Sequence, residues 1–152
     1  MKALVVYESF FGNTEQVARA IAGALGAAVL KAGDVKPERL AGLDLLVVGS
    51  ATRAFRPTPA TTALLKTIRR GTLKGTKVAA FDTRMALEDV ESGFLRFMAG
   101  RFGYAAAKIA AALRKKGGTP AAAPVGFIVT TEKGPMRAGE LERAAAWAGK
   151  LV

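Results

Sequence analysis

The sequence predicts a doubly wound α/β protein, with a five-stranded parallel sheet of order 2-1-3-4-5 and helices on both faces. Apolar runs alternate with helical patterns along the chain. The apolar runs are continuous, which is typical of parallel strands buried on both faces. Right-handed crossovers leave few topologies for such a chain, and this strand order is the natural one. The length of 152 residues suits a single domain, which we expect to span residues 1–152.

The predicted strands are short runs rich in Val, Leu, Ile or Phe, bounded by glycine or polar residues. They cover residues 2–7, 27–30, 43–49, 76–81 and 125–130.

The predicted helices show apolar side chains at a spacing of three or four residues. Gly26 is a natural stop for the first, Pro59 suits the first turn of the second, and Gly117-Gly118 closes the third. A helical turn is expected at residues 37–40. The helices cover residues 13–25, 59–70, 104–116 and 137–151.

The composition of the chain excludes several classes of catalytic and metal-binding site. The chain has no cysteine and no histidine, which excludes disulfides, zinc–thiolate sites, thiol nucleophiles and a Ser-His-Asp triad. Redox or binding chemistry that depends on a bound cofactor is therefore favoured. The apolar run after Lys2 is shorter than the core of a signal peptide and has no small-residue cleavage site, so we expect no signal peptide. No apolar stretch approaches the ~20 residues of a membrane span, so we expect no membrane and a cytoplasmic location. The net charge of +11 indicates either a soluble basic surface or an acidic partner.

The sharpest motif follows the first predicted strand and has the sequence Ser9-Phe10-Phe11-Gly12-Asn13-Thr14. A phosphate there would meet unpaired backbone N–H groups and the positive end of a helix dipole. The motif lacks the Gly-Lys-Ser/Thr of an NTPase loop and the three glycines of a dinucleotide fingerprint. A single terminal phosphate is therefore the better fit, although a polar turn that only caps the helix remains the alternative.

Residues 7–14 resemble the phosphate loop of flavodoxins, usually Ser/Thr-x-Thr-Gly-Asn-Thr. Ser9, Gly12, Asn13 and Thr14 match this pattern, whereas Phe11 replaces a hydroxyl residue. The resemblance extends over essentially the whole chain. Residues 48–52 resemble the second ligand loop of the family, residues 81–84 the start of the third, and residues 134–136 and 139–144 the end of short-chain flavodoxins.

The resemblance implies non-covalent FMN and a role in electron transfer. The implied cofactor-binding residues come from three loops. They are Ser9, Phe10, Phe11, Gly12, Asn13, Thr14, Ala51, Thr52, Arg53, Ala54, Phe55, Asp82, Thr83 and Arg84.

Flavodoxins commonly stack a Trp and a Tyr on the flavin ring. Trp147 is the only tryptophan here, and its place in the last helix predicts a packing role. Phe55 is the candidate for stacking, but a loop phenylalanine packed on a neighbour is an equal alternative. The third loop offers further side chains, namely Met85, Phe94, Phe97 and Tyr104.

Three functions follow. The first is an FMN electron carrier that serves redox partner proteins, expected to be acidic. The second is a small FMN-dependent NAD(P)H or quinone reductase, whose pocket residues 82–103 would have to build. The third is a fold that has lost FMN and binds an acidic partner. Nucleic acid is the weaker partner, because the basic helix lacks interleaved aromatic residues.

Overall fold

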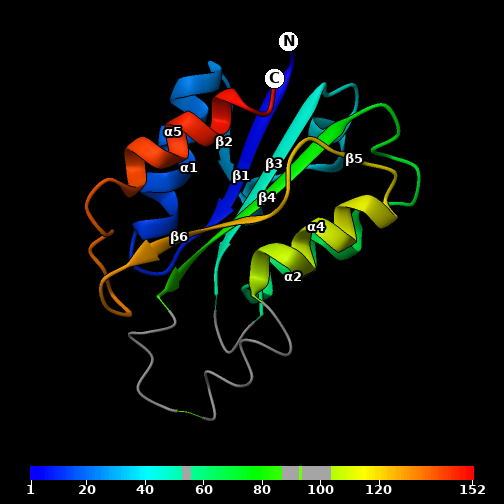
Figure 1. Cartoon of the computed structure of the whole chain (residues 1–152). Coiled ribbons are helices and arrows are strands. Elements are labelled where there is room, and N and C mark those ends of the chain that lie inside the picture. The colour runs from blue at the N-terminus through cyan, green and yellow to red at the C-terminus, as the bar shows by residue number, and fades with distance from the viewer. Residues whose placement is uncertain (53–55, 87–92, 94–103) are drawn as a thin grey trace.

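The computed structural model describes residues 1–52, 56–86, 93 and 104–152 of the chain. Its centre is a parallel sheet with the strand order β2-β1-β3-β4, and β5 and β6 both pair with β4 (Figure 1). The strands are β1 (Ala3–Glu8), β2 (Ala28–Lys31), β3 (Leu45–Ala51), β4 (Lys77–Met85), β5 (Thr119–Pro120) and β6 (Val125–Val129).

The predicted order 2-1-3-4-5 is confirmed, but the fifth strand comes in two pieces. β3 occupies one edge of β4, so β5 and β6 share the other. Between the pairs Lys77↔Thr119 and Phe81↔Val125, the segment that carries β5 and β6 advances by six residues, whereas β4 advances by four. The surplus interrupts the pairing at residues 121–124, where Pro124 also lacks an N–H to donate.

The fourth strand is longer than predicted. The polar residues 82–84 had the pattern of a loop, but they continue β4 as far as Met85. β6 pairs with them from Phe81↔Val125 to Met85↔Val129, and β3 pairs with them up to Ala51↔Thr83. Asp82, Thr83 and Arg84 are therefore strand residues, because β3 and β6 both pair with Asp82 and Thr83, and β6 continues to pair with Arg84.

Helix α1 begins and ends at the predicted residues, and Gly26 closes it with a φ of 64°. The other three helices are shorter than predicted: extended backbone at Ile68 ends α2, α4 lacks one predicted residue at each end, and Gly139 precedes the first residue of α5. Among the described residues, no helix has the length and apolar character that crossing a bilayer requires. The helices are α1 (Asn13–Leu25), α2 (Pro59–Thr67), α4 (Ala105–Lys115) and α5 (Glu140–Gly149), with short 3₁₀ turns η1 (Ala32–Asp34) and η2 (Pro37–Leu40).

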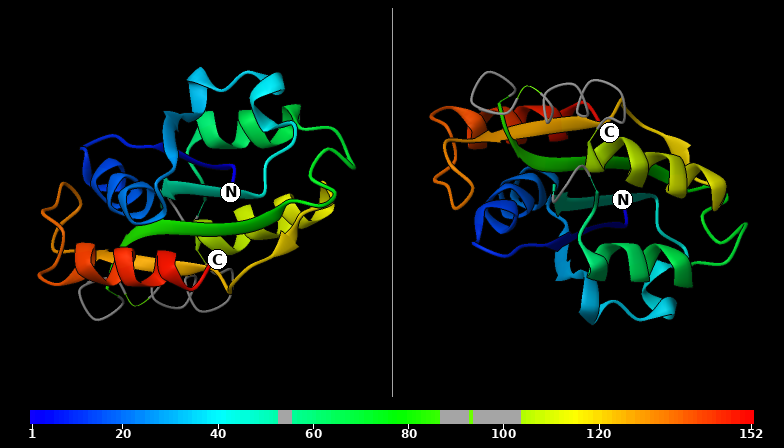
Figure 2. Two further views of the ribbon diagram at one scale, coloured as in Figure 1. Left: turned by 90° about the horizontal axis from the view of Figure 1, so that it is seen from above. Right: turned by 90° about the horizontal axis from the view of Figure 1, so that it is seen from below.

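Helices cover both faces of the sheet, with α1 and α5 on one face and α2 and α4 on the other (Figure 2). Alternate strand residues feed the two cores, so Val5 packs under α1 and α5 while Val6 faces the opposite side. Trp147 is buried, with edge-to-face contacts to Phe81 and Phe127 at centroid distances of 6.5 and 6.1 Å. Its predicted packing role is confirmed.

Side chains of α5 protect the outer edge of β6. The Ile128 N–H donates to Glu140 Oε2 at 2.7 Å, and Arg143 Nη2 donates to the Gly126 carbonyl at 2.6 Å. Arg143 also pairs with Glu140 and lies over the Phe127 ring. Backbone groups that would otherwise template another strand are thus engaged within the chain.

Candidate functional site

The loop between β1 and α1 is shaped around Gly12. Gly12 has a φ of 88°, in the left-handed region that favours glycine. Its N–H donates to Ser9 Oγ at 2.9 Å, which folds the loop back on itself. A Cβ added to Gly12 would meet no atom within 4 Å, so the space beside it is open. The first N–H groups of α1 have no acceptor inside the helix and face this opening with the positive dipole end.

Two side-chain hydrogen bonds to other segments hold this loop in place. Thr14 is buried, and its hydroxyl lies 2.8 Å from the hydroxyl of Thr83 near the end of β4. Asn13 is also buried, and its side-chain amide donates to the Lys133 carbonyl at 3.1 Å. The polar side chains of Asn13 and Thr14 thus help to fix the loop. That they also donate to a ligand stays a prediction. Ser9 accepts from Gly12, which leaves its own hydroxyl hydrogen to donate.

Lys133 is a residue of this site that sequence reasoning missed. It lies in the turn before α5, where Gly134 packs so closely on Asn13 that an added Cβ would clash with the Asn13 side-chain oxygen. The Lys133 Nζ lies 5.8 Å from the centre of the Phe11 ring. The loop at 9–14 has no cation of its own, and the fold brings one to it across 120 residues of sequence. The only sequence signal was the glycine and proline after Lys133, which mark a tight turn.

Phe10 and Phe11 give the site an apolar rim. Each is 48% exposed, and they are the exposed phenylalanines among the residues that the structure describes. Two such rings on one loop are unusual for a solvated turn, where polar residues dominate. They offer flat apolar surface next to the Gly12 opening.

The second predicted loop leaves the carboxyl end of β3. Ala51 is the last strand residue, and the Thr52 N–H donates to the Thr83 carbonyl at 3.1 Å. Ser50 Oγ accepts from the Thr58 N–H at 2.9 Å and so ties the two ends of this loop together. Three predicted site residues, Arg53, Ala54 and Phe55, lie outside the described residues.

The end of β4 carries an ion pair between a buried carboxylate and a partly exposed guanidinium. Asp82 is 0% exposed and accepts from Arg84 Nε and Nη2 at 2.6 and 2.7 Å. It also accepts from the Ala106 N–H at 2.9 Å, in the first turn of α4. Burial raises the pKa of the Asp82 carboxyl, and the hydrogen bonds from Arg84 and the Ala106 N–H oppose that shift.

The Arg84 guanidinium also makes contacts beyond its ion pair with Asp82. Its guanidinium lies 3.8 Å from the centre of the Tyr104 ring and covers Gly126 of the adjacent strand, where a Cβ would clash with it. Thr52 adds to the same cluster, because its hydroxyl accepts from the Ala105 N–H at 3.4 Å. The expectation that residues 82–84 form a loop is corrected, because they belong to β4 and Asp82 and Arg84 join β4 to α4. That they flank a ligand stays a prediction.

The fold gathers the predicted residues at one edge. Parallel strands end together, so the loop at 9–14, the end of β3 and the end of β4 all meet at the carboxyl edge of the sheet. Thr14, Thr83 and Thr52 link these three segments directly. Of the proposed stacking residues, Met85 ends β4 and Tyr104 precedes α4, whereas Phe94 and Phe97 lie outside the described residues.

Comparison with solved structures shows which fold this is. Flavodoxin 1 from Bacillus cereus matches with a TM-score of 0.76 and 17% identity, over 99% of this chain and 97% of that one. The flavodoxin of Streptococcus pneumonia TIGR4 matches with 0.77 and 16% over the same shares. A flavodoxin from the domain Archaea matches with 0.69 and 23%, over 99% and 96%. No family model and no curated protein matches the sequence. The chain has the flavodoxin-like fold.

Proposed function

We propose that this protein binds FMN non-covalently at the carboxyl edge of its sheet and carries electrons between redox partner proteins. The observation that supports this most is the open loop at 9–14, led by Gly12 in the left-handed region and cross-linked to β4 and to the turn before α5. A rigid loop of this kind at a helix N-terminus suits a phosphate monoester. The shared fold with solved flavodoxins agrees with it.

The donor set fits a single terminal phosphate. The backbone N–H groups that open α1 and the hydroxyl of Ser9 would supply hydrogen bonds, while Lys133 would supply the cation that the loop lacks. Phe10 and Phe11 would shield the group from one side. The predicted donors Asn13 and Thr14 would act by holding the backbone in this shape.

The flavin ring would lie beyond the phosphate, along the ends of β3 and β4. FMN supplies the electron chemistry when bound, and the protein binds, orients and shields it. The ion pair of Asp82 and Arg84 would keep α4 and β4 fixed behind the ring, and because the two charges compensate, Arg84 would exert little field on the flavin. Thr52 would fix the start of the second loop.

The composition of the chain also bears on its proposed partners and location. The partners are acidic proteins, since the sequence has 23 Lys and Arg residues but only 12 Asp and Glu residues, and a basic surface attracts an acidic one. The location is the cytoplasm, with which the lack of cysteine agrees.

A fluorescence titration tests the proposal. FMN fluorescence is followed while apo-protein is added, and we expect stoichiometric quenching at micromolar or lower concentration. A folded protein that leaves FMN fluorescence unchanged contradicts FMN binding and leaves the third function, binding of an acidic partner. Oxidation of NADPH by the purified holoprotein alone contradicts a pure carrier and favours the reductase.

A further inference from the structure

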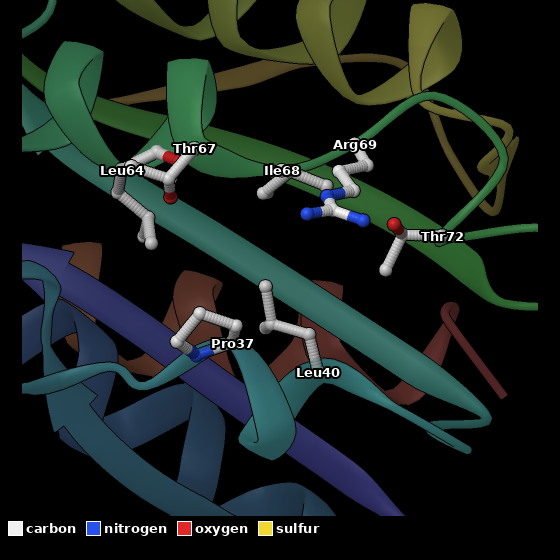
Figure 3. A pocket seen from close by; sticks show the side chains of 7 residues that line it. All are labelled: Pro37, Leu40, Leu64, Thr67, Ile68, Arg69 and Thr72. Carbon is white, nitrogen blue, oxygen red and sulfur yellow. Dashed lines mark hydrogen bonds between the residues drawn. The ribbon is translucent and has the colours of Figure 1, made fainter.

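A second site lies at the other end of the sheet. A pocket of about 360 Å³ opens between η2 and the end of α2 (Figure 3). α2 starts beyond the carboxyl end of β3 and runs back toward the start of β4, so its last turn lies near the amino ends of the strands. The loop at 9–14 follows the carboxyl end of β1. The pocket is therefore separate from the candidate FMN site.

The pocket has an apolar floor and a polar rim. Leu40, Leu64 and Ile68 are buried and form the floor, while Pro37, Thr67, Arg69 and Thr72 are exposed around it. Across the opening, side chains of α2 and the segment after it face those of η2 (Figure 3). The volume lies in the range of ~300–1,000 Å³ that binding pockets occupy. It has room for an inserted apolar side chain.

Arg69 sets the charge of this rim. None of the ion pairs formed within residues 1–52, 56–86 and 104–152 includes Arg69. The guanidinium extends over the opening (Figure 3), where it can donate two parallel hydrogen bonds to a carboxylate. An apolar floor below a guanidinium that forms no ion pair within the described part of the chain selects a ligand with an apolar group next to an acid.

Positive charge continues from the pocket across the neighbouring surface. The Gly71 and Leu73 N–H groups donate to the Lys116 carbonyl at 3.0 and 3.1 Å, which joins the segment after α2 to the end of α4. The sequence has no acidic residue between Asp44 and Asp82 or between Glu91 and Glu132. The cations on these joined segments are Lys66, Arg69, Arg70, Lys74, Lys77, Arg114, Lys115 and Lys116.

We propose that this surface docks an acidic polypeptide segment that inserts one apolar side chain into the pocket. The charged area extends beyond the pocket, so it suits a chain better than a small molecule. Nucleic acid fits less well, because the exposed aromatic rings among the described residues, Phe10 and Phe11, lie at the opposite end. Glu38 and Asp34, near the η2 side, favour an approach from α2 and α4. This docking does not depend on FMN.

Fluorescence anisotropy tests the docking with two labelled peptides of Glu and Asp, one with a central Leu and one with a central Ser. We expect the Leu peptide to bind about tenfold more tightly, because only its side chain fills the pocket. Arg69→Ala is expected to weaken the Leu peptide about fivefold, and Thr67→Glu to weaken it as well by placing an acid on the rim. Arg137→Ala is the matched control at the other end and should change nothing.

Several results would overturn the proposal. They are no binding of either peptide, equal binding of the two peptides, or equal effects of Arg69→Ala and Arg137→Ala. Tighter binding of an oligothymidylate of equal charge, with the same dependence on Arg69, would assign the surface to nucleic acid instead. Circular dichroism shows whether each variant is folded, and repetition with and without FMN separates this site from the cofactor site.

Discussion

Replacing Lys133 with alanine tests the cation that the turn before α5 brings to the phosphate loop. The Nζ of Lys133 lies 5.8 Å from the centre of the Phe11 ring, and Asn13 and Gly134 hold its backbone. We expect Lys133→Ala to weaken FMN binding without unfolding the protein, because the side chain is exposed and the hydrogen bond to Asn13 uses only its carbonyl.

The size of the effect follows from Coulomb's law. Two unit charges about 6 Å apart in water interact by about 0.7 kcal/mol, and a phosphate near its second ionisation doubles this. Physiological salt, with a Debye length of about 8 Å, removes roughly half of the gain. The expected loss is therefore about 0.7 kcal/mol, or about threefold in Kd.

The assay compares FMN with riboflavin, which has the same ring but no phosphate. Flavin fluorescence gives Kd for both ligands, and Lys133→Ala should weaken only FMN, more at low salt than at high salt. Lys150→Ala removes the same charge at the far end of α5 and should have little effect. An equal loss in both variants, or an equal loss for both flavins, would refute the assigned role of Lys133. If the unaltered protein bound neither flavin, the proposed function itself would fail.

Three further predictions concern stability. Gly12→Ala should lower the free energy of unfolding by about 1–2 kcal/mol because φ is 88°, whereas Gly23→Ala, inside α1 with open space around it, should raise it by about 0.5–1 kcal/mol; urea unfolding decides, and a neutral Gly12→Ala would contradict the backbone argument. Asp82→Asn should cost about 3 kcal/mol, because it leaves Arg84 without its partner, and adding Arg84→Met should restore part of this; a cost below 1 kcal/mol would show that the pair is dispensable. Hydrogen bonds from Arg143 lower the pKa of Glu140 below its usual 4.5, so the stability it provides is present above that pH and is lost as the pH falls through and below it; the stability gap between wild type and Glu140→Gln should therefore be wide at pH 7 and narrow at pH 3, and a gap that widens in acid would reverse the sign.

At residues 82–84 of the candidate site, the local pattern of polar and apolar residues predicted the wrong secondary structure. Polar residues after an apolar run predicted a loop at 82–84, but Asp82 and Arg84 lie two apart on one face of β4 and form their ion pair there. A strand interpretation of the same residues would have predicted that pair. Nothing local indicated that β6 would pair along this stretch and extend the strand.

The sequence by itself determined the elements that depend on neighbours along the chain. Strand order, the bounds of α1, the stop at Gly26 and the position of the Gly12 loop all follow from periodicity, turn residues and the handedness of crossovers. These properties are local or topological, so one sequence carries them. The packing role of Trp147 also follows, because a helix in a doubly wound fold must bury one face.

Only the tertiary structure decided which distant residues meet. The placement of Lys133 beside Phe11, the link between Thr14 and Thr83, and the pocket under Arg69 all join segments far apart in the chain. So does the division of the last strand into β5 and β6, because the surplus of residues appears only when the register against β4 is known. Such contacts depend on distances between elements that packing alone sets, and no pattern of consecutive residues contains those distances.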